Sequence, residues 1–274
     1  MLTTSIFISA VIAGIVAILV TLAIERWGGL TGGLLGTMPS TIVPAAAGMY
    51  LAGGELLLIQ SLIIVPYGML INSLFLGVWI VLPPYLENSK RPLFMTTVGS
   101  LGVWGLTGLS VLFGVQFAVE YGIASVWIAL FGLFVLVGLA VWMNWNNRAA
   151  PKGKQSVALP ILVLRGSAAA IAIGIAVWLS STGQAFVAGL AAVFPAIFLT
   201  SMVALWLAQG STVPRGAAGP MALGGASVAI YALVAMYSLP EFGVYVGSLI
   251  AWTTSVLGWS LPVYLVLKSR VIPD

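Results

Sequence analysis

The sequence predicts an all-α integral membrane protein with nine transmembrane helices, arranged as two four-span repeats of opposite orientation joined by one linking span. Three observations predict this class. Of the 274 residues, 61% are hydrophobic and only 6% are charged, whereas about a quarter of the residues of a soluble domain are charged. The apolar residues fall into nine runs suited to crossing about 30 Å of hydrocarbon. Short sequence motifs also recur in the same order in both halves of the chain.

The nine apolar runs are separated by short polar or glycine-rich segments, and they cover residues 4–24, 30–52, 56–82, 92–114, 126–146, 157–180, 185–208, 217–238 and 243–267. No basic residue precedes the first run, which therefore predicts a retained transmembrane helix and not a cleaved signal peptide.

The charged residues between the runs predict the orientation of the chain. With the N-terminus outside and the spans alternating, no Lys or Arg falls outside, where Glu55, Glu120 and Glu241 lie. The basic residues at the inner ends are Arg26, Lys90, Arg91, Arg148, Lys152, Lys154, Arg215, Lys268 and Arg270. Cytoplasmic loops are enriched in Lys and Arg, so we expect the N-terminus outside and the C-terminus inside. The net charge of +4 is then a topology signal, and we expect no nucleic-acid partner.

Sequence motifs repeat between the halves. Gly33–Pro39 (GLLGTMP) matches Gly189–Pro195 (GLAAVFP), and Val98–Trp104 (VGSLGVW) matches Val246–Trp252 (VGSLIAW). A Leu-Pro pair ends the third and the eighth run. These matches predict a first repeat in residues 1–120, a linking span and loop in 121–155, and a second repeat in 156–274. Because equivalent spans are five apart, the second repeat is inverted, an arrangement that recurs in secondary transporters.

The second repeat resembles the GlpM-type small bacterial membrane proteins, which are single four-span units. Ala188–Leu190 before Phe194-Pro195, and Val246–Ser248 before Trp252, carry the resemblance. It extends over about residues 160–267 and, more loosely, over residues 5–114. The resemblance implies a duplicated four-span unit in the plasma (inner) membrane of a bacterium, and no defined activity.

Proline-broken spans are the first candidate site. Thr37 and Pro39 lie in one break, and Pro195 lies at the matched position of the other. Proline removes a backbone donor and frees a carbonyl, and transporters build central substrate sites from such broken helices. The alternative is a kink that only shapes packing.

Arg165 is the only charged residue well inside an apolar run. An intramembrane charge indicates a solute or lipid-headgroup contact; alternatively, its long side chain snorkels to the inner interface. Asn72, Ser100 and Ser248 are polar residues within spans, and they either line a polar pathway or join helices. Four glycines spaced by three, Gly99, Gly102, Gly105 and Gly108, predict close helix contact.

The chain has no His and no Cys, and no carboxylate lies deep in a run. We therefore expect no enzyme activity, no metal and no other cofactor. The sequence favours a permease for a small neutral or anionic solute that works by alternating access. A channel-like or lipid-handling protein and a non-transporting subunit of a membrane complex are the alternatives. The lipid bilayer and a small-molecule solute are the expected partners, and a homo-oligomer or a membrane-complex partner stays open.

Overall fold

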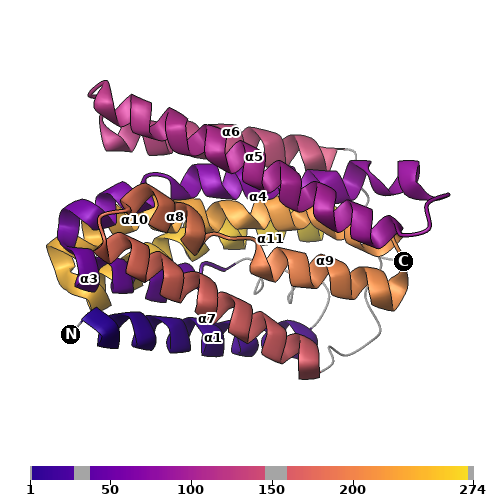
Figure 1. Cartoon of the computed structure of the whole chain (residues 1–274), viewed down its shortest axis with the longest axis horizontal. Helices are drawn as coiled ribbons and strands as arrows, with labels where there is room; N and C mark the ends of the chain where they lie inside the picture. The colour runs from indigo at the N-terminus through magenta and orange to yellow at the C-terminus, as the bar shows by residue number, and fades with distance from the viewer. Residues whose placement is uncertain (1, 28–37, 146–158, 271–274) are drawn as a thin grey trace.

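Helices make up the secondary structure of the described chain. The computed structural model describes residues 2–27, 38–145 and 159–270, and no strand occurs in these ranges. Water-free hydrocarbon offers backbone groups no partner, so a sequence this apolar satisfies them within helices. The helices shown in Figure 1 are α1 (Leu2–Trp27), α3 (Ile42–Leu62), α4 (Val65–Val81), η1 (Pro83–Leu86), α5 (Pro92–Glu120), α6 (Ser125–Trp145), α7 (Leu159–Ser181), α8 (Ala185–Ala192), α9 (Ala196–Gln209), α10 (Thr212–Ser255), η2 (Val256–Ser260) and α11 (Leu261–Arg270).

Six helical segments of the described chain are long and apolar enough to cross a membrane. They are Ile42–Leu62, Pro92–Glu120, Ser125–Trp145, Leu159–Ser181, Ala185–Leu207 and Thr212–Ser269. Two shorter apolar helices, Thr3–Leu19 and Val65–Val81, accompany them. The prediction of an all-α, membrane-type protein is thus confirmed, whereas the count of nine spans stays a prediction.

The long helix α10 folds back on itself at Gly243. This glycine has φ 75° and ψ 171°, a backbone conformation that is essentially restricted to glycine. Beyond it, the position of a Cβ on Gly247 would collide with the carbonyl of Ser238, and the Ser238 hydroxyl donates to the Gly247 carbonyl over 2.9 Å. Residues nine apart in a straight helix would be separated by about 13 Å. α10 therefore consists of two antiparallel segments, which meet near the predicted boundary between the runs 217–238 and 243–267.

Helices α1 and α7 pack closely and antiparallel through small residues. A Cβ on Gly14 would lie 3.2 Å from the Cβ of Ala170, and a Cβ on Gly174 would lie 3.4 Å from that of Ala10. One turn before Ala170 on α7 and one turn after Gly14 on α1, a Cβ on Gly166 would lie 2.6 Å from Ile18. Residues later in α7 thus meet residues earlier in α1. Small side chains let two membrane helices approach in this way.

The helices form layers, with α4 and α10 in the middle (Figure 1). α5 and α6 run along one side of this middle layer, and α1 and α7 run along the other. The largest fully buried side chains include Trp79, Phe75 and Tyr231. These side chains belong to α4 and α10, and Met49 of α3 and Leu136 of α6 are also fully buried, so the core extends from the middle layer to its neighbours.

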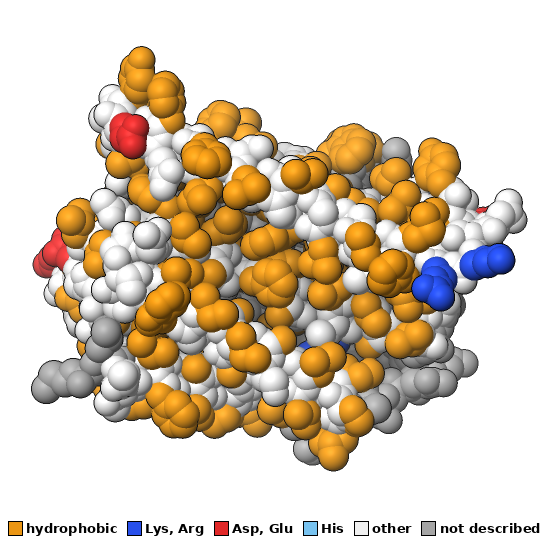
Figure 2. Space-filling view, viewed as in Figure 1, with side chains coloured by type: hydrophobic (Ala, Val, Ile, Leu, Met, Phe, Trp, Pro, Cys, Tyr) orange, Lys and Arg blue, Asp and Glu red, His pale blue; other side chains and the backbone are white. Residues whose placement is uncertain are grey.

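The surface of the described chain is apolar along the length of the helices and charged at their ends. Figure 2 shows hydrophobic side chains across the middle of one face, acidic side chains at the end where the N-terminus lies, and basic side chains at the opposite end. Trp142, Trp145 and Trp178 are exposed, as are large apolar residues such as Leu106, Phe113, Phe134 and Tyr245. A lipid environment accounts for this arrangement, and it agrees with the predicted membrane location.

The glycine spacing in α5 was predicted to bring helices into close contact, and this is wrong for two of the four residues. A Cβ on Gly99 would lie 3.2 Å from Leu82, and one on Gly108 would lie 3.4 Å from Leu190. Positions Gly102 and Gly105 meet nothing within 4 Å among the described residues. A helix turns about 100° per residue, so each step of three shifts the position by about 60°. The four glycines are therefore spread over half of the helix circumference and cannot all face one neighbour.

Candidate functional site

The side chain of Arg165 points into the protein. It lies in the second turn of α7 and is only 6% exposed. Its Nη2 donates a hydrogen bond of 2.8 Å to the hydroxyl of Ser201 on α9, and that hydroxyl donates over 2.6 Å to the carbonyl of Ile197. A snorkelling side chain would instead end at the inner interface. The guanidinium of Arg165 therefore lies inside the bundle and does not reach the inner interface.

The helix that Arg165 contacts begins directly after a break. α8 ends at Ala192, residues Val193 and Phe194 leave the helical path, and α9 begins at Ala196. Pro195 has no N–H to continue the ladder of α8, and its ring would clash with the carbonyl one turn earlier. The break at Pro195 was predicted from the sequence and is present. Both Val193 and Pro195 are buried, so their polar backbone groups depend on protein partners.

Asn72 of α4 supplies such a partner. Its Nδ2 donates to the carbonyl of Val193 over 2.8 Å, and its Oδ1 accepts from the indole Nε1 of Trp104 over 2.9 Å. The Trp104 ring also meets the ring of Phe194 edge-on, with centroids 5.2 Å apart. Asn72 is 2% exposed, as expected for an amide that faces protein. This cluster, which we call the Asn72 cluster (Asn72, Trp104, Val193 and Phe194), holds the break against α4 and α5.

The remaining predicted site residues are not all joined to this cluster. Pro39 is buried in the non-helical residues 38–41 before α3, and Thr37 lies outside the described residues. The Ser100 hydroxyl donates to the carbonyl of Thr97 in its own helix over 2.9 Å. Ser248 is buried beside the hydroxyl of Tyr231, and neither hydroxyl has a partner of hydrogen-bond geometry in the described chain. The Ser100 hydroxyl thus bonds within its own helix, whereas Asn72 bonds to the break that Pro195 ends.

Ser201 and Trp104 are the partners that sequence reasoning did not assign to a site. Both were visible as residues within spans: Ser201 as one of many scattered hydroxyls, and Trp104 as the last residue of a repeated motif. A buried guanidinium and a buried amide each require polar partners, so the sequence signals that partners exist. Which residues they are depends on helix packing.

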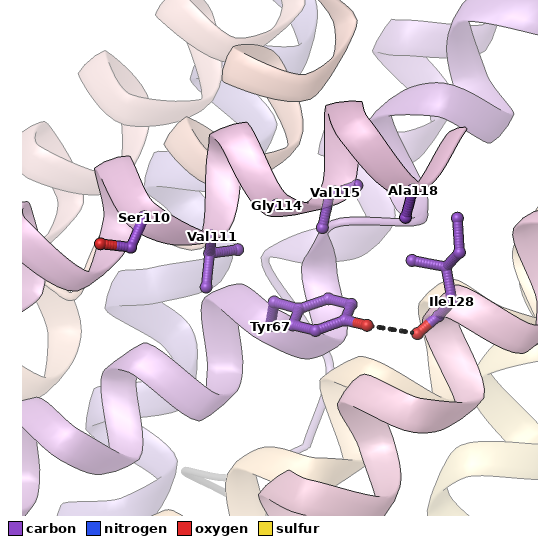
Figure 3. Close-up of a pocket in the computed structure, with 7 residues that line it drawn as sticks. All are labelled: Tyr67, Ser110, Val111, Gly114, Val115, Ala118 and Ile128. Atoms are coloured by element: carbon purple, nitrogen blue, oxygen red, sulfur yellow. Dashed lines mark hydrogen bonds between the residues drawn. The ribbon is translucent and has the colours of Figure 1, made fainter. Parts of the chain in front are cut away.

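A separate cleft of about 330 Å³ opens between α4, α5 and α6 (Figure 3). Its lining residues are Tyr67, Ser110, Val111, Gly114, Val115, Ala118 and Ile128. The Tyr67 hydroxyl donates to the carbonyl of Ile128 over 2.8 Å, and the Ser110 hydroxyl donates to that of Leu106 over 3.1 Å. Both hydroxyls are thus engaged by backbone, and the cleft is an apolar surface.

The described residues contain no group of three or more His, Cys, Asp or Glu that could hold a metal ion. Comparison with known proteins finds no family model, no curated protein and no solved structure that matches this chain.

Proposed function

We propose that the protein is a membrane permease that carries a small neutral or anionic solute by alternating access between two inverted four-span repeats. The observation that carries the proposal is the burial of Arg165 against α9, the helix that begins directly after the break at Pro195. A charge inside a bundle of membrane helices and a broken helix are two features from which transporters build substrate sites. Here the arginine bonds to Ser201 on α9, six positions after Pro195.

Contacts between equivalent residues support the inverted repeat. Pro39 and Pro195 are 156 positions apart in the chain. The same offset relates Gly14 to Ala170, which are in contact in the α1–α7 pair, and Met69 to Gly225, where a Cβ on Gly225 would lie 2.7 Å from the Met69 Cε. In a two-fold arrangement, a residue that touches its own equivalent lies on the axis. Two such contacts at one offset are expected if an axis relates the repeats.

Backbone conformation at the matched turns gives further support. Gly54 has φ 73° and ψ −172°, and Gly210, which follows it by the same offset of 156 positions, has φ 79° and ψ −178°. The two residues interrupt α3 and end α9. Equivalent positions with one unusual conformation favour a duplication. The relation to GlpM-type four-span proteins and the domain limits of 1–120, 121–155 and 156–274 are parts of the same proposal.

The distribution of charge supports the orientation with the N-terminus outside. Lys90 and Arg91 lie in the loop after α4 and η1, and Arg215 in the first turn of α10 donates to the Ile80 carbonyl near the end of α4 over 3.0 Å. These residues therefore share one end of the bundle. Figure 2 shows acidic side chains at the other end, with the N-terminus, and only a small acidic area beside the basic side chains. The positive-inside rule then assigns the basic end to the cytoplasm.

The cleft beside Tyr67 favours lipid handling as a second candidate function. Its apolar lining between α5 and α6 fits an acyl chain better than a polar solute, because its two hydroxyls already bond to backbone carbonyls. In this reading Arg165 contacts a lipid headgroup and no solute crosses the membrane.

Solute counterflow in proteoliposomes tests the permease. The purified protein is reconstituted, the vesicles are loaded with one of a panel of small neutral and anionic solutes, and uptake of the labelled solute is followed over time. A permease gives saturable uptake that is accelerated by solute on the opposite side. Uptake that is linear in concentration indicates a channel. Vesicles no more permeable than protein-free ones, for every solute tested, would contradict both, and transfer of labelled lipid between vesicles would then favour the second candidate.

A further inference from the structure

The Asn72 cluster joins parts of the chain that are far apart in sequence. The amide of Asn72 on α4 and the indole of Trp104 on α5 belong to residues 1–120, whereas the Val193 carbonyl belongs to residues 156–274. The bond from Asn72 to Val193 links residues 121 positions apart. Its geometry is directional, so a shift of one half against the other by an ångström or two would break it.

The local sequence is suited to this contact. Gly68 lies one turn before Asn72 on α4, and a Cβ there would collide with the side chain of Val193. The absence of a side chain at this position lets α4 approach the break closely enough for the amide to reach the carbonyl. Met69 also places its sulfur 3.6 Å from the Asn72 Nδ2. Asn72 thus uses its donor and its acceptor within a buried, closely packed contact.

The residue equivalent to Asn72 cannot make the corresponding contact in the other half. At the offset of 156 positions that relates Pro39 to Pro195, the equivalent of Asn72 is Val228. Valine has no polar side-chain atom and can neither donate nor accept a hydrogen bond. The indole is present in both halves, because Trp252 ends the motif matched to the one that Trp104 ends, where the offset is 148 positions. The two halves therefore share the break and the tryptophan but differ in the amide.

We propose that Asn72 is a latch that holds the second break closed against the first half of the protein, and that the first break lacks a latch of this kind. This inference rests on the proposed alternation between inverted repeats. In a transporter of this kind, the inward-facing and outward-facing states interconvert when the two repeats exchange conformations. An amide bond that Asn72 makes and its equivalent Val228 cannot make leaves the two conformations unequal in free energy and sets which of them the resting protein adopts.

Single-cysteine labelling can measure this because the chain has no native cysteine. Two reporter positions are equivalent in the repeat: Ser40 follows Pro39, and Ala196 follows Pro195, again with an offset of 156. Ser40 is half-buried and Ala196 is 4% exposed. The rate at which N-ethylmaleimide alkylates Ser40→Cys or Ala196→Cys in protein reconstituted into nanodiscs reports the opening of each break.

The decisive variant is Asn72→Leu, which keeps the size of the side chain and removes the hydrogen bonds to Val193, Trp104 and the Met69 sulfur. We expect alkylation of Ala196→Cys to accelerate about tenfold, which corresponds to the loss of roughly 1.4 kcal/mol. Alkylation of Ser40→Cys should stay the same or slow down. Trp104→Phe keeps the bond from Asn72 to Val193 and removes only the indole donor, so it should raise the rate at Ala196→Cys by a smaller factor.

Ser73→Ala is the matched control. Ser73 is the next residue on α4, is equally buried, and donates only to the Met69 carbonyl of its own helix over 3.1 Å. Its removal should leave both reporters unchanged. A rate at Ala196→Cys that stays within twofold of the parent in Asn72→Leu would overturn the latch, as would an equal acceleration at both reporters or in the control. If Asn72→Leu does not yield monodisperse protein, Asn72→Ala, which also removes the donor to the Val193 carbonyl, decides by the same criteria.

The labelling experiment needs no transported solute. Its result can therefore contradict the Asn72 latch without contradicting the permease, and the reverse. Acceleration at Ala196→Cys without counterflow of any solute would leave the latch standing and contradict the permease. Counterflow with unchanged labelling would contradict the latch alone.

Discussion

The amide of Asn72 donates a 2.8 Å hydrogen bond to the carbonyl of Val193, in the non-helical step between α8 and α9. A broken helix inside a membrane bundle leaves backbone groups that lipid cannot satisfy, and here a side chain from a distant helix satisfies one of them. The approach of α4 to the break therefore governs both the stability of this region and any motion of α9, the helix that carries the Ser201 partner of Arg165.

The close approach of α4 predicts opposite effects for two glycines of the same helix. Gly68→Ala would bring a methyl group into Val193, whose β-branched side chain has little freedom to move aside. We expect a loss of about 1–3 kcal/mol, typical of overpacking. Gly77→Ala meets nothing within 4 Å, and the better helix propensity of alanine should make it neutral or stabilising by up to about 1 kcal/mol. Thermal unfolding of the two purified variants, compared with the parent, measures both. Equal stability of the two variants would contradict the approach described for α4.

The sequence predicted the class of fold well. Membrane helices are largely determined by local composition, because a long apolar stretch without charges has few other stable forms. The break at Pro195 was predicted for the same reason, since proline acts on its own backbone. The reversal at Gly243 fell at a predicted boundary, where Pro240 and Glu241 interrupt the apolar runs.

The partners of the site could not be predicted from the sequence. Arg165 was singled out by its charge, but its contact with Ser201 depends on how α7 and α9 cross. Spacing alone was also misleading in α5, where glycines three apart were expected to share a contact and instead point in different directions. Ser100 and Ser248 have the same place in the repeated motif, yet Ser100 bonds within its helix and Ser248 lies beside Tyr231. A single sequence shows the composition of each span and the spacing of its residues, whereas tertiary contacts depend on the distances between helices.

The charge distribution predicts which ends of the helices face the cytoplasm. A reporter enzyme or tag inserted after Lys90, in the loop before α5, should report the cytoplasm, and one inserted next to Glu120, at the far end of the same helix, should report the opposite side. The 29 residues of α5 span about 43 Å at 1.5 Å per residue, so its ends reach both surfaces. Both reporters on one side of the membrane would refute the orientation and the crossing of α5.

The antiparallel contact of α1 and α7 predicts a specific crosslink. A Cβ on Gly14 would lie 3.2 Å from the Cβ of Ala170, slightly closer than the 3.5–4.5 Å typical of disulfides. The double variant Gly14→Cys/Ala170→Cys should therefore form a disulfide in high yield under mild oxidation. Gly138→Cys/Ala170→Cys serves as the control, because a side chain on Gly138 meets nothing within 4 Å. The crosslink is read as a mobility shift in denaturing gels that a reducing agent reverses. Equal yields in the two pairs would contradict the packing and remove one of the two contacts that support the repeat axis.

Substitution of Arg165 separates a functional role from a purely structural one. If the guanidinium binds the solute, Arg165→Lys should slow counterflow, because an ammonium group cannot reproduce the planar fork of donors. Arg165→Ala should lower it by at least about tenfold, since a hydrogen bond to a charged group contributes roughly 1.5–3 kcal/mol. Ser201→Ala removes the neutral partner and leaves the charge, so its effect should be smaller than that of Arg165→Ala.

Each counterflow rate is normalised to the folded protein in the vesicles, and thermal unfolding shows whether stability has changed. A structural Arg165 would lower stability in Arg165→Ala while the normalised counterflow stayed at the parent rate in all three variants. That result would leave the helical bundle as described and remove the charge on which the permease proposal depends.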